Sequence, residues 1–214
     1  MNTRKLQEEK KLLKLNKRQR GIIVGLLLGD GHLETQNGGR TYRLKVEHSS
    51  AQTDYVRWLF TELREWIPAH APYEKIRADG SKNIGFTTYS HGALRFYAQQ
   101  FYEEKRKKIP FRVAQMLSPI SLAVWFMDDG SRKSLRHHTY IIHTLGFSRK
   151  DLIQTQQALQ KVFDLSVTLH QQKQKYWRLY IPSKSVQKFE QIIEPYVRPI
   201  ESMKHKLVTL KPKK

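Results

Sequence analysis

Two apolar runs, each ending in the dipeptide Asp-Gly, constrain the fold of this chain more than any other feature. The first spans residues 23–31 (Ile-Val-Gly-Leu-Leu-Leu-Gly-Asp-Gly) and the second residues 122–130 (Leu-Ala-Val-Trp-Phe-Met-Asp-Asp-Gly). Neither run carries a polar stripe at helical period, so each is expected to form a helix that is buried on most sides. One buried helix in each half of the chain suggests an internal repeat.

The residues after each run continue the parallel. Tyr42 recurs as Tyr140, and Asp54 heads a helical pattern of apolar residues as Asp151 does. The pattern in each repeat therefore predicts a helix ending in Asp-Gly, two strands, a helix, two strands and a helix. We expect an α+β fold of two pseudo-symmetric αββαββα domains. The predicted organisation is a first domain at residues 1–103 with a basic N-terminal extension at 1–20, a linker at 104–112 and a second domain at 113–214.

The net charge of the chain narrows the choice of partner. The sequence contains 39 Lys and Arg against 19 Asp and Glu, a formal charge of +20. A charge this high is expected where the partner is a polyanion, so nucleic acid ranks first and an anionic membrane second. A merely solvated lysine-rich surface is the alternative, but it would normally be offset by nearby acids. A membrane partner is disfavoured because no basic amphipathic helix stands alone.

The absence of cysteine and of a secretion signal argues against several further classes of protein. Without Cys, the chain has no disulfide framework, thiolate nucleophile or Cys-containing zinc site. The N-terminus is polar and basic and lacks the apolar core of a secretory signal, so we expect an intracellular protein. Bacterial cytoplasm, mitochondrion and chloroplast all stay open as locations.

Strand patterns place basic side chains on one face of each expected sheet. In residues 41–47, Arg43 and Lys45 alternate with Leu44 and Val46, so one face is basic and the other apolar. Residues 73–78 and 176–180 repeat this pattern less clearly. Two such sheets would make a long basic saddle for duplex DNA, with some side chains reaching base edges and others phosphates. The expected DNA contacts are Arg40, Arg43, Lys45, Lys75, Arg77, Lys82, Arg132, Lys133, Arg136, Lys173, Lys175 and Arg178.

The two apolar helices are expected to pack on each other. Gly21, Gly25 and Gly29 fall four residues apart on one face, where the missing side chains allow a second helix backbone to approach closely. If the helices pair about a pseudo-twofold axis, Asp30 and Asp129 come side by side at their C-terminal ends. The two carboxylates would then share one small space.

Two adjacent carboxylates at the negative ends of helix dipoles repel each other unless a cation lies between them. Oxygen ligands without Cys suit Mg²⁺, with Mn²⁺ as the alternative, and metal-assisted phosphodiester hydrolysis is the reaction that follows. A single Asp-Gly after a helix is more often an ordinary turn, but two of them in a repeat on a basic chain favour a site. Two roles stay open for Asp128, that of a helix cap and that of a contact at the helix interface.

These runs resemble the paired signature helices of the LAGLIDADG homing endonucleases, and the resemblance extends through most of the chain. Residues 117–130 are similar to the second motif of the monomeric, double-motif branch typified by the yeast mitochondrial omega-intron endonuclease. The most specific part is residues 125–130, Trp-Phe-Met-Asp-Asp-Gly. The resemblance implies two LAGLIDADG domains that form a DNA-binding saddle.

The resemblance also implies roles for individual residues. Asp30 and Asp129 would be the catalytic acids that bind the metal, with the main-chain carbonyls of Gly29 and Asp128 as further ligands. A basic residue is expected near each scissile phosphate, at Lys107 and Lys206. The neighbouring residues stay open as alternatives, and so does plain DNA-backbone contact for either lysine. These neighbours are Lys108 and Lys204.

The implied function is that of a monomeric, site-specific homing endonuclease. It would make metal-dependent double-strand breaks in a long duplex, and the target would be asymmetric because Gly29 and Asp128 differ at equivalent positions. The alternatives are an RNA maturase that assists intron splicing, with intron RNA as partner, and a noncatalytic DNA-binding relative. The cluster of His137, His138 and His143 has no acid at ligand spacing, so surface or DNA contact is favoured over a metal site.

Overall fold

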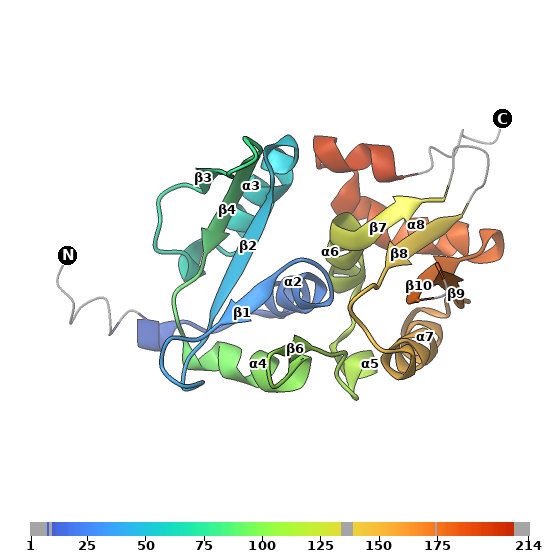
Figure 1. Ribbon diagram of the computed structural model, residues 1–214, viewed down its shortest axis with the longest axis horizontal. Helices are drawn as coiled ribbons and strands as arrows, with labels where there is room; N and C mark the ends of the chain where they lie inside the picture. Colours follow the sequence, from blue (N-terminus) through green and yellow to red (C-terminus); the bar gives the residue numbers. More distant parts are fainter. Residues whose placement is uncertain (1–7, 9, 134–138, 174, 208–214) are drawn as a thin grey trace.

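The computed structural model describes residues 8, 10–133, 139–173 and 175–207. Two four-stranded antiparallel sheets lie on either side of two central helices, one from each half of the chain (Figure 1). Each half follows the order αββαββα, so the expected α+β fold with two pseudo-symmetric units is confirmed. Within the described ranges, every helix is too short or too polar to cross a lipid bilayer.

The N-terminal sheet has the strand order β1-β2-β4-β3, and its core side is covered by helices. Short 3₁₀ turns at residues 50–52, 64–66 and 92–94 connect some of these elements. The elements are α2 (Lys17–Leu28), β1 (His32–Glu34), β2 (Arg43–Ser49), α3 (Thr53–Glu62), β3 (Tyr73–Ile76), β4 (Lys82–Thr87) and α4 (Arg95–Phe101).

The C-terminal sheet has the equivalent order, β7-β8-β10-β9. The polar segment expected as a linker, residues 104–112, includes β6 of a small hairpin that turns at Glu104 with positive φ. The remaining elements are β5 (Tyr102–Glu103), β6 (Arg106–Lys107), α5 (Val113–Met116), α6 (Pro119–Asp129), β7 (Gly130–Arg132), β8 (Tyr140–His143), α7 (Arg149–Phe163), β9 (Thr168–Gln172), β10 (Tyr176–Ile181), α8 (Ser183–Val197) and a 3₁₀ segment, η4 (Glu201–Lys206).

The strand expected at residues 41–47 lies two residues further along the chain. Tyr42 forms only an isolated bridge with His91, and continuous pairing begins at Arg43. The alternation itself holds, because Leu44 and Val46 face the core while Arg43 lies on the opposite, half-buried face. The sheet therefore has one apolar and one polar face.

The central helices α2 and α6 pack closely because three glycines remove side chains from α2. A Cβ added at Gly21 would lie 2.5 Å from Ile120, one at Gly25 would lie 2.6 Å from the carbonyl oxygen of Ser121, and one at Gly29 would lie 2.4 Å from the side chain of Asp128. Any larger residue would push the helices apart. The helix pairing predicted from the glycine spacing is confirmed.

Both central helices begin at a capping box. The side chain of Asn16 accepts from the N–H of Gln19 at the start of α2, and Ser118 and Ser121 form the equivalent pair before α6. These caps fix where each helix begins, and its length then determines where its C-terminal acid lies. The two helices lie between the sheets (Figure 1), and their C-terminal ends are in contact through the hydrogen bond from Asp30 to Asp128.

Candidate active site

Three aspartates meet at the C-terminal ends of the central helices. Asp30 follows Gly29 at the end of α2, and its side chain is 53% exposed. Asp128 and Asp129 are the last residues of α6. The N–H of Asp30 donates to Oδ2 of Asp128 at 2.9 Å, so the two helix ends are in direct contact. The sequence predicted that Asp30 and Asp129 lie side by side, and the hydrogen bond observed between the helix ends joins Asp30 to the neighbouring Asp128.

The side chain of Asp128 lies inside the interface between the two halves. It has no exposed surface, and its Oδ1 accepts a hydrogen bond of 2.7 Å from the hydroxyl of Tyr55 on α3. Burial is the main cause that raises the pKa of Asp128 to about 6, and the charge of Asp30 raises it further. Of the two roles left open for this residue, the structure shows the interface contact.

Asp129 has the more strongly perturbed carboxyl group. Burial raises its pKa to about 8, and the negative charges of Asp128 and Asp30 act in the same direction. The ammonium of Lys107 lowers the pKa in part. A carboxyl group with this pKa is mostly protonated at neutral pH unless another cation approaches it. The site therefore favours an additional positive charge.

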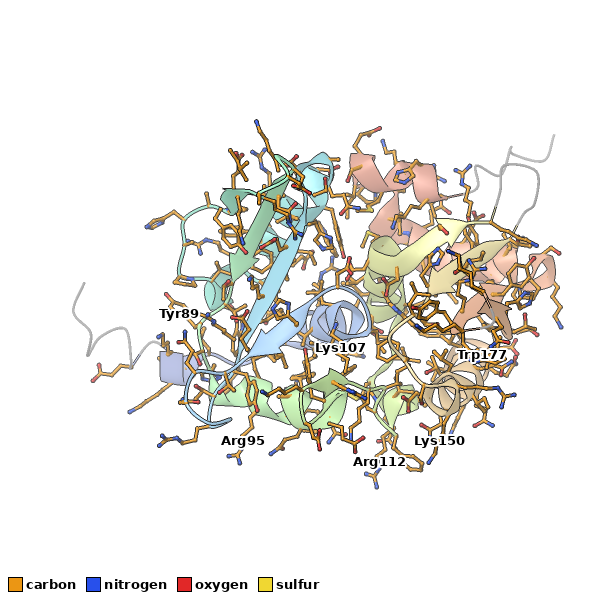
Figure 2. The ribbon with its side chains drawn as sticks, in the orientation of Figure 1. Tyr89, Arg95, Lys107, Arg112, Lys150 and Trp177 are labelled. Carbon is orange, nitrogen blue, oxygen red and sulfur yellow. The ribbon has the colours of Figure 1, made fainter. Side chains whose placement is uncertain are left out.

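Two lysines, one from the connecting hairpin and one from the C-terminal half, lie against the carbonyls at these helix ends. Nζ of Lys107, on β6, donates to the carbonyl oxygen of Gly29 at 2.6 Å, and Nζ of Lys206, on η4, donates to the carbonyls of Met127 and Asp128. Burial lowers the pKa of both lysines, while the three aspartates oppose this shift. Figure 2 shows Lys107 between the halves, close to α2.

The structure separates these lysines from their neighbours in sequence. Lys108 pairs with Glu103 at 3.5 Å, and the exposed Lys204 pairs with Glu201. Neither contact involves the three aspartates. Lys107 and Lys206 are thus the two of the four candidates whose ammonium groups face the helix ends. The carbonyls of Gly29 and Asp128, expected as metal ligands, accept hydrogen bonds from these ammonium groups here.

His48, on β2, was not predicted from the sequence. Its side chain is only 4% exposed, with Nδ1 3.7 Å from Oδ2 of Asp30 and Nε2 3.7 Å from Oδ1 of Asp128. Nε2 has no hydrogen-bond partner among the described residues. One ligand atom from each of these three residues lies within 4.8 Å of the others, a spacing that could hold a metal ion. The one sequence signal was a polar residue at the inward position after Leu44 and Val46.

The halves are also joined beside the site. The carboxylate of Asp54, at the start of α3, accepts from the N–H of Ser202 in the C-terminal half at 2.8 Å. Together with the bond from Tyr55 to Asp128, this contact fixes α3 against the far half. Tyr55, fully buried, has a pKa well above its usual value because of burial and the nearby Asp128. It therefore stays a hydrogen-bond donor.

The basic residues expected to contact DNA lie on or beside the two sheets. A hollow of about 630 Å³ runs from Asp30 over the polar face of the N-terminal sheet. The strands of the N-terminal sheet carry Arg43, Lys45, Lys75 and Lys82, and the adjoining loops carry Arg40 and Arg77. The strands of the C-terminal sheet carry Arg132 and Arg178, and the residues beside them include Lys133, Lys173 and Lys175. Arg136, His137 and His138 lie outside the described residues. His143 is half-buried on β8, where it contacts Ser131.

Comparisons with known proteins agree with this geometry. A family model described as the LAGLIDADG DNA endonuclease family matches residues 20–189. The chain is 30% identical to DNA endonuclease I-ChuI of Chlamydomonas applanata, over 91% of this chain and 96% of the relative. It is 26% identical to the cytochrome b mRNA maturase bI2 of Debaryomyces hansenii, over 90% of this chain and 74% of the relative.

A solved structure gives a similar result. The homing endonuclease I-WcaI bound to its DNA recognition sequence superimposes with a TM-score of 0.86 at 25% identity. The match covers 98% of this chain and 95% of that chain. The similarity therefore includes both halves and the paired helices between them.

Proposed function

This chain belongs to the LAGLIDADG DNA endonuclease family, and on that premise we propose that it is a site-specific homing endonuclease. It makes metal-dependent double-strand breaks in a long, asymmetric duplex site and acts as a monomer. The domains are residues 1–103 and 113–214, joined by residues 104–112. The observation that carries the proposal is the contact between Asp30, after α2, and the end of α6, whose last residue is Asp129, with the ammonium groups of Lys107 and Lys206 against these helix ends.

The residues at the helix ends fit a divalent cation. Asp30 and Asp129 would hold it, together with the carbonyls of Gly29 and Asp128, and oxygen ligands of this kind suit Mg²⁺ or Mn²⁺. The raised pKa of Asp129 supports the assignment, because a cation would relieve the repulsion that raises it. Bound there, the ion would supply an activated water and stabilise charge on the leaving oxygen.

The protein's own groups position and stabilise the reacting phosphates. The ammonium groups of Lys107 and Lys206 contact different helix ends, the first that of α2 and the second that of α6, so each is suited to stabilise developing charge on one strand. The difference between Gly29 and Asp128 makes the two halves chemically unequal and supports an asymmetric target. I-WcaI, which is similar along nearly the whole chain, is described as bound to its DNA recognition sequence.

Cleavage selection from a randomised duplex library tests this function. We expect Mg²⁺-dependent double-strand cleavage at one asymmetric site, and none in EDTA. Asp30→Asn and Asp129→Asn should bind the selected duplex without making double-strand breaks. Undiminished cutting by Asp129→Asn would reject the proposed site.

A second candidate function is RNA maturation. The maturase of Debaryomyces hansenii is similar over 90% of this chain, and intron RNA is the partner that such a function requires. A DNA-binding protein without catalysis needs neither Asp30 and Asp129 nor Lys107 and Lys206, so the joint presence of these residues favours cleavage. Splicing of intron-containing RNA with and without the protein separates maturation from cleavage.

A further inference from the structure

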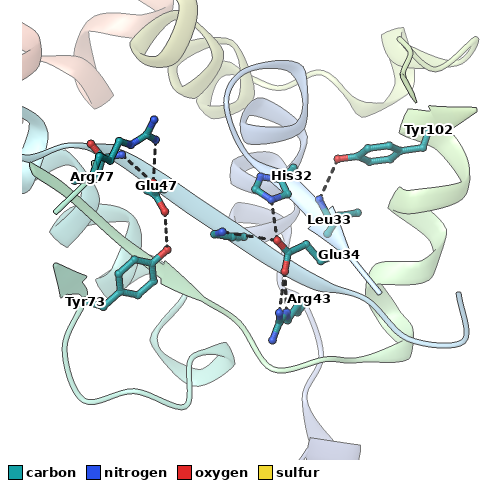
Figure 3. A network of polar contacts seen from close by, with 10 residues as sticks. His32, Leu33, Glu34, Arg43, Glu47, Tyr73, Arg77 and Tyr102 are labelled. Carbon is teal, nitrogen blue, oxygen red and sulfur yellow. Dashed lines mark hydrogen bonds and ion pairs between the residues drawn. The ribbon is translucent and has the colours of Figure 1, made fainter. Parts of the chain in front are cut away.

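Two glutamates lie on the polar face of the N-terminal sheet, among the basic residues expected to contact DNA. Glu34, on β1, is paired in register with Arg43, and Glu47 follows Lys45 on the same side of β2 (Figure 3). A carboxylate on a DNA-binding surface repels the phosphate backbone. Its presence there needs a reason other than affinity.

The carboxylate of Glu34 contacts three basic side chains. Its Oε2 accepts from Nε and Nη2 of Arg43, at 3.1 and 2.9 Å, while its Oε1 lies 3.1 Å from Nε2 of His32 and 3.8 Å from Nζ of Lys45. Because Arg43 uses its Nε side for the carboxylate, the N–H groups at its outer end stay available. A guanidinium restrained in this way has lost much of its rotamer freedom before any ligand arrives.

Glu47 has a similar arrangement on the next strands. It accepts hydrogen bonds of 2.8 Å from Nδ2 of Asn83, 3.0 Å from Nη2 of Arg77 and 3.2 Å from the hydroxyl of Tyr73. The hydrogen bond from Asn83 is the largest cause that lowers the pKa of Glu47 to about 2. Glu47 therefore stays ionised wherever DNA is a ligand, and its contact with Arg77 persists.

A glycine makes this second network fit. Glu47, Gly85 and Tyr73 are paired in one row across β2, β4 and β3. A Cβ at Gly85 would lie 2.9 Å from the hydroxyl of Tyr73, so the missing side chain is what lets the phenol cross β4 to reach Glu47. The sheet is thus built to bring the donor and the carboxylate together.

The described strands of the C-terminal sheet have no carboxylate that could orient their basic side chains in this way. Its four described strands contain no Asp or Glu. Arg132 and Arg178 each have a buried Nε without a hydrogen-bond partner among the described residues, while the ammonium of Lys133 lies over the ring of Tyr180. No carboxylate on these strands fixes the orientation of the basic groups.

We infer that Glu34 and Glu47 are specificity-determining residues. They orient Arg43 and Arg77 toward base edges in the half-site under the N-terminal sheet, and guanine is the base that a fixed guanidinium distinguishes best, through O6 and N7. The basic residues of the C-terminal sheet bind mainly the phosphate backbone, which carries little sequence information. This inference rests on the proposed function as a site-specific DNA-binding protein.

The test compares binding to the selected duplex, to its single-base variants and to a scrambled duplex, all in EDTA so that no strand is cut. Glu47→Gln and Glu34→Gln remove the charge but preserve the shape. We expect each to bind the scrambled duplex as tightly as the unsubstituted protein or more tightly, and to lose at least tenfold in discrimination within the N-terminal half-site. Tyr73→Phe, which removes one donor to Glu47, should give a smaller loss in the same place.

Glu74→Gln is the matched control. Glu74 follows Tyr73 on β3 and therefore faces the other side of the sheet, so the same charge change should leave discrimination unaltered. The half-sites are assigned by hydroxyl-radical cleavage from an iron–EDTA probe on Asp79→Cys, a single attachment point because the chain has no other cysteine. Asp79 lies beside Gly80 in the turn between β3 and β4.

The outcomes separate this inference from the proposed function. Unchanged discrimination in Glu34→Gln and Glu47→Gln, or an equal loss in both half-sites, overturns the inference while sequence-specific binding stands. Weaker binding of every duplex to the same extent also overturns it, since that result indicates a structural role. Absence of any sequence preference in the unsubstituted protein contradicts the proposed function itself.

Discussion

Nζ of Lys107 lies 2.6 Å from the carbonyl oxygen of Gly29, the residue immediately before Asp30. Lys206 has the equivalent relationship to the end of α6, where it donates to the carbonyl of Asp128. Carbonyls at a helix C-terminus carry a partial negative charge that attracts a cation. Each of the two helix ends that bear an acid thus has one ammonium group against it.

This arrangement predicts that the two lysines act in the chemical step. Lys107→Met and Lys206→Met should each lower the single-turnover cleavage rate by about 10²-fold or more, because a positive charge near the reacting phosphate is lost. Duplex affinity in EDTA should change by no more than a few fold. Rapid-quench cleavage and fluorescence anisotropy measure the two quantities.

The neighbouring lysines provide the controls. Lys108→Met and Lys204→Met remove the same charge from side chains that pair with Glu103 and Glu201, away from the aspartates. Both should cleave at close to the unsubstituted rate. An equal loss of rate and affinity in Lys107→Met would make that lysine a phosphate contact.

A second prediction concerns stability. Asp129→Asn removes a carboxyl group whose pKa is raised by burial and by two neighbouring acids, so ionising it in the folded state is costly. In EDTA at pH 8.5 the variant should melt at a temperature higher by roughly 2–4 °C for each kcal/mol of relieved repulsion. Saturating Mg²⁺ should reverse the order of the two melting temperatures. A lower melting temperature for the variant in EDTA would contradict this account.

A third prediction follows from the pH dependence of the same group. Because the folded-state pKa of Asp129 is about 8, above its value of about 4 in an unfolded chain, the metal-free protein loses stability as pH rises between these values. Divalent cation binding requires the ionised form, so binding at pH 6.5 should release about one proton and weaken roughly tenfold for each pH unit below 8. Calorimetric titrations in buffers of different ionisation enthalpy count the protons. Binding without proton release at pH 6.5 would refute the assignment.

A fourth prediction concerns the helix interface. Gly25→Ala places a Cβ 2.6 Å from the carbonyl oxygen of Ser121, a backbone atom that cannot move without shifting α6. We expect a loss of about 1–3 kcal/mol in the free energy of unfolding, measured in urea. Gly146→Ala is the control, since nothing lies within 4 Å of its added Cβ. Equal stability of the two variants would show that the close approach is unimportant.

The repeat, the class of fold and the pairing of the central helices could be predicted from sequence patterns alone. Periodicity and glycine spacing report which face of an element is buried and how closely another backbone can approach. For that reason Asp30 and Asp129 could be expected at neighbouring helix ends.

Which side chains from distant segments reach those ends depends on the packing of the elements. Adjacent residues such as Lys107 and Lys108 have the same local sequence signal, and the path of the hairpin alone separates them. His48 and Tyr55 come from β2 and α3, and they converge on Asp128 because the sheet and helix pack across the interface between the halves. Local patterns fix the conformation of each element, but the distances between groups far apart in the chain depend on how those elements pack.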